Sequence, residues 1–318
     1  MDDIKPVVMI GAGPSSLAAA IYTTREDIDT VLYEKAVVGG LAAITDVVDN
    51  YPGFSEGVKG MDLAEQLQKQ AERFGAKIEY GDVTSLKREA DAITMTVDGK
   101  TVRADAVLIA TGSDYNKMGI PGEAEYYGRG VHYCATCDGA FYRDKRLIVV
   151  GGGNSAVQET VFLTRYASRI DILVRSTIKA SQVLQDDLQQ YIDSGKVVVH
   201  LDVTPDEIIG QDANSIRAVK ATQDGQPIEF ETDGVFVFIG LKPNTQFLEG
   251  SGIELDARGL IVTNKDLETA LPGVFASGDV RSNATMQVAS AVGEGATAAL
   301  NIRKYLEGVE RTRRETTN

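Results

Sequence analysis

The chain has two cysteines, which form a Cys-x-x-Cys pair at Cys134 and Cys137, and Asp138 follows at once. This spacing lets the pair close a small disulfide that is easily reduced and re-formed. A neighbouring carboxylate can carry a proton to or from a thiolate, which dithiol redox chemistry requires. We therefore predict a redox-active disulfide at Cys134 and Cys137 with Asp138 as its acid–base residue. A helix N-cap is a compatible second role for Asp138.

A zinc half-site and a pair of inert buried thiols are the alternatives for the Cys-x-x-Cys pair. Zinc needs two further ligands, and the only histidines are His132 and His200, so we expect no metal site. For His132 we expect a structural role rather than proton transfer. In a reducing compartment such a cysteine pair is more often catalytic or metal-binding than structural.

The first glycine-rich segment has the context of a dinucleotide-binding turn. It reads Gly11-Ala12-Gly13-Pro14-Ser15-Ser16, follows a predicted strand at 6–10 and opens a predicted helix at 17–24. The next strand ends in Glu34, 23 residues after Gly11. The glycines let the backbone approach a pyrophosphate, the helix N-terminus favours its charge, and the acid would accept ribose hydroxyls.

A second glycine-rich segment, Gly151-Gly152-Gly153-Asn154-Ser155-Ala156, follows a predicted strand at 147–150. Here the second strand ends in Val174-Arg175, with Lys179 nearby, instead of an acid. Arg and Lys can accommodate a 2′-phosphate, so the pattern favours NADPH over NADH. An ordinary solvated basic pair at a strand end is the alternative.

The two glycine-rich segments belong to a longer repeat. Asp98-Gly99 and Asp224-Gly225 each lie between extended runs, as in β-hairpins. The spacing Asp-x-Val-(x)4-Gly-(x)3-Asn is shared by residues 105–116 and 233–244. Two copies of one nucleotide-binding design, offset by about 130–140 residues, indicate a duplicated unit.

This repeat predicts an α/β fold with two Rossmann-like (three-layer ββα) nucleotide-binding domains, the second inserted in the first. We expect residues 1–113 and 246–318 to form the first domain and residues 114–245 the second, with hinges at 113–116 and 242–244. Strands at 260–263 and 273–276 and a helix from about 286 to 306 complete no third unit and are assigned to the first domain. The polar tail from Gly308 onward has no periodicity, and we expect it to fray.

Asp279 follows Ser277-Gly278, just before the last predicted helix. Its carboxylate could accept a hydrogen bond from a polar cofactor chain, or it could cap the turn. The helix N-terminus near 286–288 would stabilise negative charge on a reduced ring.

Charge and hydropathy restrict the function classes. Acidic residues outnumber basic ones 46 to 32 among 318 residues, giving a net charge of -14. Such a field repels phosphate backbones and anionic lipid, so we expect no nucleic-acid or membrane partner. No apolar run approaches the ~20 residues of a membrane helix, and the acidic start lacks the features of a signal peptide. We therefore expect a cytoplasmic protein.

Taken together, these motifs resemble the low-molecular-weight thioredoxin reductases, a branch of the pyridine nucleotide–disulfide oxidoreductases. The resemblance runs from about Lys5 to Leu306, and its most specific part is the segment 132–139, which reads HYCATCDG. The second glycine cluster and the segments 50–53, 110–112 and 277–280 also match.

The resemblance implies that the first domain binds FAD, that the inserted domain binds NADPH, and that the substrate is thioredoxin or a thioredoxin-like protein. Cys137 would lie next to the flavin and Cys134 would attack the partner's disulfide. Arg129 and Phe141 match positions linked to docking that partner, and a homodimer is expected. A rotation at the hinges would bring first the nicotinamide and then the dithiol to the flavin. The candidate cofactor-binding residues are Gly11, Gly13, Pro14, Ser15, Glu34, Gly40, Leu41, Asn50, Val83, Thr111, Gly112, Gly151, Gly153, Asn154, Ser155, Arg175, Lys179, Gly278, Asp279, Gln287 and Val288.

Three departures from the family pattern bear on the electron donor and the flavin. The NADPH segment usually reads His-Arg-Arg-Asp-x-Phe-Arg-Ala, whereas residues 174–180 are one residue shorter and lack the second Arg. Leu41 stands where Gln is common, and Met286 replaces the Arg before Gln287. The main hypothesis is an FAD-dependent thioredoxin-disulfide reductase using NADPH. The alternatives are a flavin thioredoxin reductase that uses NADH, or ferredoxin and no nicotinamide, and a redox-sensing flavoprotein.

Overall fold

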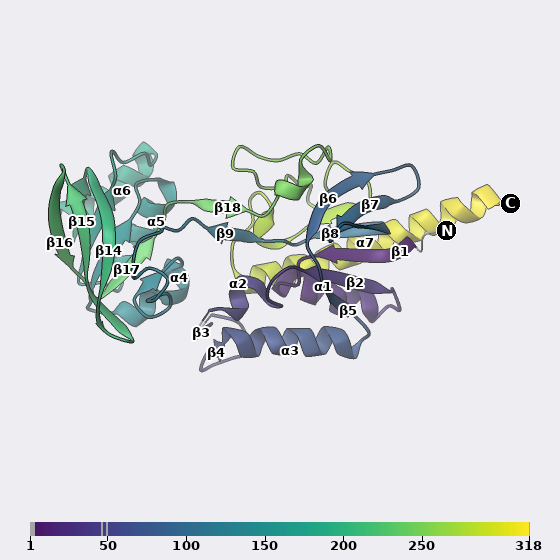
Figure 1. Ribbon diagram of the computed structural model, residues 1–318, viewed down its shortest axis with the longest axis horizontal. Helices are drawn as coiled ribbons and strands as arrows, with labels where there is room; N and C mark the ends of the chain where they lie inside the picture. Colours follow the sequence, from purple (N-terminus) through teal and green to yellow (C-terminus); the bar gives the residue numbers. More distant parts are fainter. Residues whose placement is uncertain (1–3, 46, 49, 318) are drawn as a thin grey trace. The chain divides into compact units, whose positions relative to one another are not determined.

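The computed structural model describes residues 4–45, 47–48 and 50–317. The chain divides into two compact units, one formed by Met1–Asp114 with Lys242–Asn318 and the other by Tyr115–Leu241. Figure 1 shows the chain coloured along its sequence, with the second unit in teal and green. The middle of the chain therefore folds by itself between two segments that fold together.

The first unit is built on a mostly parallel sheet. Its strand order is β5-β2-β1-β8-β7-β6, and β19 also pairs with β8. All pairs among β5, β2, β1, β8 and β19 are parallel, whereas β6, β7 and the first half of β8 form an antiparallel meander. The strands are β1 (Ile4–Ile10), β2 (Thr30–Glu34), β5 (Lys77–Tyr80), β6 (Val83–Arg88), β7 (Ile93–Val97), β8 (Lys100–Ile109) and β19 (Val274–Ala276).

Helices cover one face of this sheet. A core of Leu17, Leu67 and Ile302 with residues of β1, β2 and β8 joins α1 (Pro14–Thr24), α3 (Gly60–Arg73) and α7 (Val288–Thr317) to the strands. The other face packs against a second cluster that includes Leu86, Leu248 and Val280. Smaller elements are α2 (Gly40–Ala43), β3 (Val47–Val48), β4 (Val58–Lys59), η2 (Gln246–Leu248) and η3 (Gly278–Val280).

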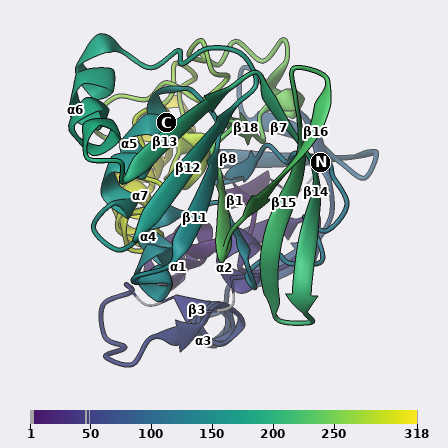
Figure 2. The same cartoon turned by 90° about the vertical axis from the view of Figure 1, so that its left-hand side faces the viewer.

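The second unit repeats this plan. Its parallel sheet has the order β10-β17-β11-β12-β13. Two helices, α5 and α6, cover one face, and the antiparallel sheet β14-β15-β16 covers the other (Figure 2). The elements are β10 (Val131–His132), α4 (Ala135–Asp138), η1 (Gly139–Tyr142), β11 (Arg146–Val150), α5 (Asn154–Leu163), β12 (Arg169–Val174), α6 (Gln182–Asp193), β13 (Val197–Leu201), β14 (Val203–Asp212), β15 (Ser215–Gln223), β16 (Gln226–Glu231) and β17 (Gly234–Val237).

The repeat predicted from the sequence is confirmed by the topology. The order β5-β2-β1-β8 with β19 beside β8 corresponds strand by strand to β13-β12-β11-β17-β10. Both hairpin turns have positive φ at both central residues, 46° and 76° at Asp98-Gly99 and 51° and 76° at Asp224-Gly225. Positive φ at both positions is the geometry of the tight hairpin turn that such Asp-Gly pairs favour. The α/β fold with two Rossmann-like units is thus confirmed.

Two short strands, β9 (Ser113–Tyr115) and β18 (Leu241–Pro243), connect the units and pair with each other. The two asparagines of the repeated spacing stand at equivalent places beside them. The backbone N–H of Asn116 donates to the Gly240 carbonyl oxygen at 3.0 Å, and the backbone N–H of Asn244 donates to the Gly112 carbonyl oxygen at 3.0 Å. The repeated Gly-(x)3-Asn spacing therefore encodes the same backbone bond at each connection.

The structure corrects several boundaries. The tail from Gly308 does not fray: α7 continues to Thr317, and Arg313 Nη1 lies 2.9 Å from the Asp105 Oδ2 atom of β8. Five of the ten residues 308–317 are Arg or Glu, which favour helices, and the ion pair with Asp105 anchors the segment. The helix N-terminus expected near 286–288 is confirmed, because α7 begins at Val288; Met286 itself has φ of 57° and lies outside the helix.

Two further element predictions fail. Residues 260–263, all of which the structure describes, form no strand, and only Ile261 makes isolated bridges, to Leu255 and Arg281. The sequence also predicts a helix from the second glycine segment through about Tyr166, whereas α5 ends at Leu163. Among the residues that the structure describes, no helix has the length and apolarity to cross a membrane.

Candidate active site

The two cysteines form a disulfide at the start of a one-turn helix. Cys134 and Cys137 are bonded, with their Cα atoms 5.3 Å apart. Cys134 is the N-cap of α4, and its Sγ accepts a hydrogen bond from the Cys137 amide at 3.2 Å. Both cysteines are half-buried, while Ala135 between them is buried in the core. The core thus holds the turn in place and leaves the disulfide within reach of a reactant.

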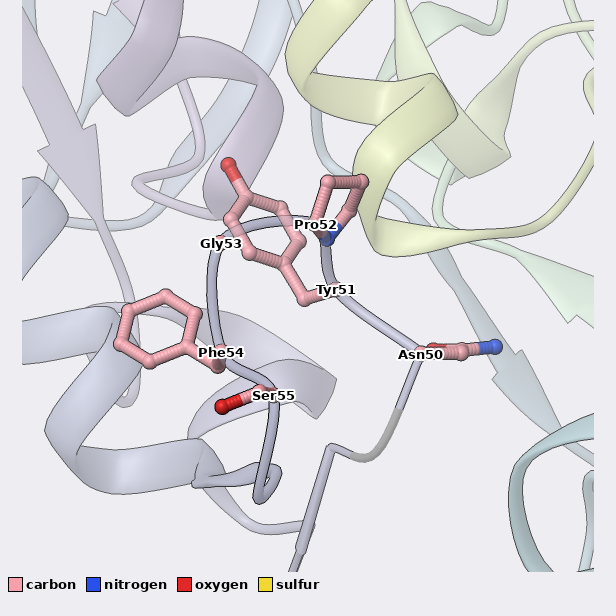
Figure 3. Close-up of a pocket in the computed structure, with 6 residues that line it drawn as sticks. All are labelled: Asn50, Tyr51, Pro52, Gly53, Phe54 and Ser55. Carbon is pink, nitrogen blue, oxygen red and sulfur yellow. The ribbon is translucent and has the colours of Figure 1, made fainter.

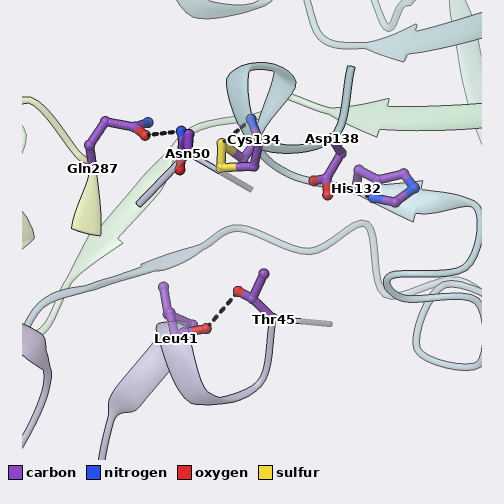
Figure 4. Close-up of a disulfide and its surroundings, with 8 residues drawn as sticks. Leu41, Thr45, Asn50, His132, Cys134, Asp138 and Gln287 are labelled. Carbon is purple, nitrogen blue, oxygen red and sulfur yellow. Dashed lines mark hydrogen bonds and ion pairs between the residues drawn. A yellow bond between two sulfur atoms is a disulfide. The ribbon is translucent and has the colours of Figure 1, made fainter. Parts of the chain in front are cut away.

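Asp138 stands at the N-cap position of η1 without a side-chain capping bond, and its carboxylate contacts a histidine. Its Oδ2 atom lies 3.3 Å from His132 Nδ1, and Figure 4 shows the two side chains beside each other. The other ring nitrogen, Nε2, lies 2.7 Å from the Tyr142 hydroxyl. Burial and the charge of Asp138 raise the pKa of the Tyr127 phenol. Asp138 is therefore a half-buried carboxylate close to the disulfide in sequence and in contact with a proton-bearing side chain.

The first glycine turn has the geometry that a dinucleotide requires. Gly11 has φ of 93°, and a Cβ there would lie 2.6 Å from the Ala110 carbonyl oxygen, so only glycine fits. Gly13 is the N-cap of α1, with Pro14 as its first residue, and a Cβ on Gly13 would meet nothing within 4 Å. The turn therefore leaves open space in front of the helix N-terminus, where a phosphate group can approach the backbone.

Glu34 closes the end of β2 beside this turn. Its Oε2 accepts from the Ala12 amide at 2.8 Å and its Oε1 accepts from the Ala36 amide at 2.8 Å. Each oxygen keeps acceptor capacity, because a carboxylate oxygen can take two hydrogen bonds. The Gly81 amide donates to the Glu34 carbonyl oxygen at 3.0 Å, so the loop before Val83 meets the same strand end.

Three segments distant in the chain converge on the N-terminus of α1. A Cβ on Gly40 would lie 3.8 Å from Gly13 Cα. The Ser15 and Ser277 hydroxyls are hydrogen-bonded at 2.7 Å, and a Cβ on Gly278 would lie 3.2 Å from Ser15 Cβ. The structure therefore brings together the glycine turn, α2 and the 277–279 turn, and each of these segments contains candidate cofactor-binding residues.

Asp279 is a partly buried carboxylate near this convergence. Burial and the charge of Glu294 raise the pKa of Asp279 to about 6. Among the described residues no hydrogen bond to this carboxylate is present, although the Asp279 backbone carbonyl accepts from the Ser113 hydroxyl at 2.5 Å. A partly buried acceptor without a hydrogen-bond donor can accept from a ligand that carries hydroxyl groups.

The remaining candidate residues of the first unit lie in several separate segments. Asn50 Nδ2 donates to Gln287 Oε1 at 2.9 Å, and Leu41 in α2 offers only its carbonyl, which accepts from the Thr45 hydroxyl at 2.9 Å (Figure 4). Val288 begins α7. Asn50 to Ser55 line an open hollow of about 490 Å³ (Figure 3). Val83 is buried in the core, and Thr111 and Gly112 follow β8.

The second glycine turn reproduces the geometry of the first. A Cβ on Gly151, which has φ of 139°, would lie 2.4 Å from the Phe238 carbonyl oxygen. Gly153 is the N-cap of α5, and a Cβ there would again meet nothing within 4 Å. Each of the two glycine turns therefore has a glycine that passes close to the end of a strand, followed by a helix with open space at its N-terminus. In the second turn, Asn154 and Ser155 begin the helix α5 and are exposed.

The loop that carries the basic residues is tied to this second turn. The Lys179 amide donates to the Gly152 carbonyl oxygen at 2.6 Å, and the Ser181 amide donates to Asn154 Oδ1 at 2.8 Å. The side chains of Arg175 and Lys179 are exposed. These two bonds keep both cations at the turn, where an anionic group on a bound dinucleotide can meet them.

Two contacts in the site were not found by sequence reasoning. His132 was expected to be structural, yet it touches Asp138, six residues along the chain. Glu294, in the following helix α7, accepts from the Gly278 amide at 2.8 Å and pairs with Arg281. Neither contact has a signal in residue spacing, because each joins different elements.

A reducible disulfide and two dinucleotide turns define an oxidoreductase that couples a nucleotide to a disulfide. In agreement, residues 5–295 match the family described as pyridine nucleotide-disulphide oxidoreductase. A thioredoxin reductase of Listeria innocua is 43% identical over 96% of this chain and 95% of its own length. For a thioredoxin reductase of Bacillus subtilis the identity is 40%, over 98% of each chain.

Solved structures agree with the relatives. A thioredoxin reductase from Streptococcus pyogenes superposes with a TM-score of 0.91 at 34% identity, covering 97% of this chain and 100% of that one. The chain therefore belongs to the pyridine nucleotide-disulphide oxidoreductase family, and within it to the thioredoxin reductases. The family resemblance drawn from the sequence is confirmed, and Cys134–Cys137 is its redox disulfide.

Proposed function

We propose that the enzyme is a thioredoxin-disulfide reductase in which electrons pass from NADPH through FAD to the Cys134–Cys137 disulfide, and then to a thioredoxin-like protein. The observation that carries this proposal is the half-buried disulfide in the same unit as the second glycine turn. The first unit would bind FAD and the second NADPH. We also propose a homodimer located in the cytoplasm, where such a cysteine pair serves catalysis rather than structure.

The first unit supplies groups suited to FAD. The N-terminus of α1 after Gly13 offers backbone N–H groups and the positive end of a helix dipole to a pyrophosphate. Glu34 would accept ribose hydroxyls, and the partly buried Asp279 carboxylate would accept a hydroxyl of the ribityl chain. When bound, FAD supplies a two-electron carrier between nicotinamide and disulfide. Further contacts are proposed from Pro14, Ser15, Gly40, Leu41, Asn50, Val83, Thr111, Gly112, Gly278, Gln287 and Val288.

In the second unit, Gly151, Gly153, Asn154 and Ser155 would receive the NADPH pyrophosphate. Arg175 and Lys179 would bind the 2′-phosphate, because both cations are exposed on a loop that is tied to the turn. One Arg of the family pattern is missing from this loop, which supports a second candidate with NADH, or a protein donor such as ferredoxin, in place of NADPH.

The chemistry at the disulfide needs two electrons and two protons. They convert the Cys134–Cys137 disulfide to two thiols. The Cys134 thiolate then attacks the partner's disulfide, forming a mixed disulfide and releasing one partner thiol. Cys137 attacks Cys134 Sγ in turn, releasing the second thiol and restoring the enzyme disulfide. Asp138 would give and take the thiol protons.

Anaerobic stopped-flow mixing of the holoenzyme with NADPH and with NADH tests the donor. We expect bleaching of the oxidised flavin band at a much lower NADPH than NADH concentration. Arg175→Ala should raise the NADPH concentration for half-maximal rate about tenfold and leave the NADH value unchanged, since a charge-assisted phosphate contact is lost. Arg165→Ala, which removes an exposed cation elsewhere in the unit, is the control.

Each other outcome has a definite meaning. A preference for NADH keeps the enzyme class and refutes the phosphate role of Arg175 and Lys179. No bleaching with either nucleotide, in a protein that photoreduction still reduces, favours a protein donor. A Cys134→Ser variant that reduces thioredoxin at the wild-type rate refutes the thiol chemistry.

A further inference from the structure

One histidine joins the proposed acid–base residue to a buried phenol. His132 is buried, at 5% exposure, and each of its ring nitrogens has a partner. Nδ1 lies 3.3 Å from Asp138 Oδ2, and Nε2 lies 2.7 Å from the Tyr142 hydroxyl. The Asp138 carboxylate, the His132 ring and the Tyr142 hydroxyl therefore contact one another in series, and Asp138 directly follows Cys137 in the chain.

Chemistry decides which nitrogen carries the proton. Nδ1 lies at ion-pair distance from Asp138 Oδ2, although the two groups do not form a hydrogen bond in this arrangement, so a proton on Nδ1 would face the carboxylate. Burial, Asp138 and Asp233 raise the pKa of Tyr142 far above its usual value, so the phenol stays protonated and can donate to Nε2. A histidine with its proton on Nδ1 can thus face the carboxylate and accept from the phenol in a single tautomer.

The imidazole is clamped by its surroundings. Its ring stacks on Phe236 with centroids 5.2 Å apart, and the Tyr142 ring meets it edge-on at 5.2 Å. A Cβ on Gly234 would lie 2.4 Å from the Tyr142 ring, so the tyrosine occupies space that only glycine leaves free. The strands β10 and β17, which carry His132 and Phe236, are paired at these two residues. Neither ring can turn without disturbing the core.

We propose that His132 is a positioning residue for Asp138: its Nδ1–H orients the carboxylate and favours the ionised form that accepts a thiol proton. This inference rests on the proposed function, because it takes Asp138 as the residue that moves the thiol protons. The titratable groups that interact with the Asp138 carboxylate are the phenols of Tyr127 and Tyr142, and the charge of Asp233 also raises the pKa of Tyr142. Among these described neighbours, only His132 can carry a positive charge.

The test follows single-turnover oxidation of the reduced holoenzyme by the chromogenic disulfide dithionitrobenzoate across the pH range. Its small size removes any effect of protein docking, and its leaving group needs no proton. In wild type the rate should fall at low pH as Asp138 takes up a proton. His132→Phe keeps a ring on Phe236 but loses the donor, so we expect the low-pH midpoint to rise by about one pH unit.

Two substitutions separate positioning from packing. His132→Asn retains an N–H donor at the place of Nδ1 and should restore the wild-type midpoint, even if its folded state is less stable. The control is His200→Asn, which alters the other histidine of the chain, paired with Asp171 in the same unit. It should leave the midpoint unchanged.

Asp138→Asn keeps this inference distinct from the proposed function. If Asp138→Asn abolishes the low-pH midpoint and His132→Phe leaves it in place, the histidine is structural and only this inference fails. If Asp138→Asn leaves the profile unchanged, the proton role of Asp138 fails and the inference falls with it. Should His132→Phe not fold, Tyr142→Phe decides: a smaller rise supports the proposal, and an unchanged midpoint overturns it.

Discussion

The contact between the first and last helices of the first unit makes a sharp prediction about Gly295. This residue is buried where α7 crosses α1. A Cβ there would lie 2.0 Å from the Ser15 carbonyl oxygen and 3.2 Å from the Ala19 nitrogen. Both are backbone atoms, so no side-chain rotation can relieve the clash. Gly295→Ala must therefore push the helices apart or distort one of them.

The same helix offers a matched control in Gly293, which is exposed and where a Cβ would meet nothing within 4 Å. Alanine favours a helix over glycine by about 1 kcal/mol, so Gly293→Ala should stabilise the protein by roughly 0.5–1 kcal/mol. Gly295→Ala has the same intrinsic gain, but overpacking a tight contact costs about 1–3 kcal/mol, and here the neighbour is rigid. We expect a net loss of about 2 kcal/mol.

The measurement is urea and thermal unfolding of both variants, together with their flavin content. The predicted loss corresponds to a Tm lower by roughly 4–8 °C for a unit of this size. Flavin content should fall as well, because Ser15 also meets the 277–279 turn. Equal unfolding midpoints for the two alanine variants, or a Gly295→Ala variant more stable than wild type, would refute the close helix contact.

The remaining predictions concern charged groups. Burial raises the pKa of Asp279 to about 6, above the ~3.9 of an unfolded chain, so its charge destabilises the fold increasingly as pH rises through this interval. Asp279→Asn should raise the urea midpoint of flavin-free protein at pH 8, leave it unchanged at pH 4 or below, and reduce flavin retention. Burial opposes ionisation of Asp171, but hydrogen bonds from Arg169 and His200 prevail and hold its pKa below the usual range. The ionised Asp171 therefore stabilises the fold fully above about pH 4, and this stabilisation is lost as pH falls through the pKa of Asp171 in the folded protein. In urea unfolding, Asp171→Asn should reduce the loss of stability between neutral and acidic pH. Arg313→Ala should cost about 1 kcal/mol in thermal unfolding, because the Arg313 side chain is 48% exposed and solvent screens its ion pair with Asp105.

The accuracy of the sequence-based predictions depended on the range of the interactions. The glycine turns were found because a strand end followed at once by a helix start leaves room only for glycine, as Gly11 and Gly151 show. The hairpins at 98–99 and 224–225 were found for a similar local reason. By contrast, the end of α7 depends on Arg313 reaching Asp105, about 200 residues earlier in the chain. Local periodicity cannot report such an anchor.

The sequence by itself determined the duplicated unit, the Cys-x-x-Cys disulfide and the two nucleotide turns, because each depends on residues that are neighbours in the chain. Only the tertiary structure decided which side chains act on them. It placed His132 against Asp138, Ser277 against Ser15, and Glu294 near Asp279. These contacts join separate elements, and their distances follow from how strands and helices pack, which residue spacing does not encode.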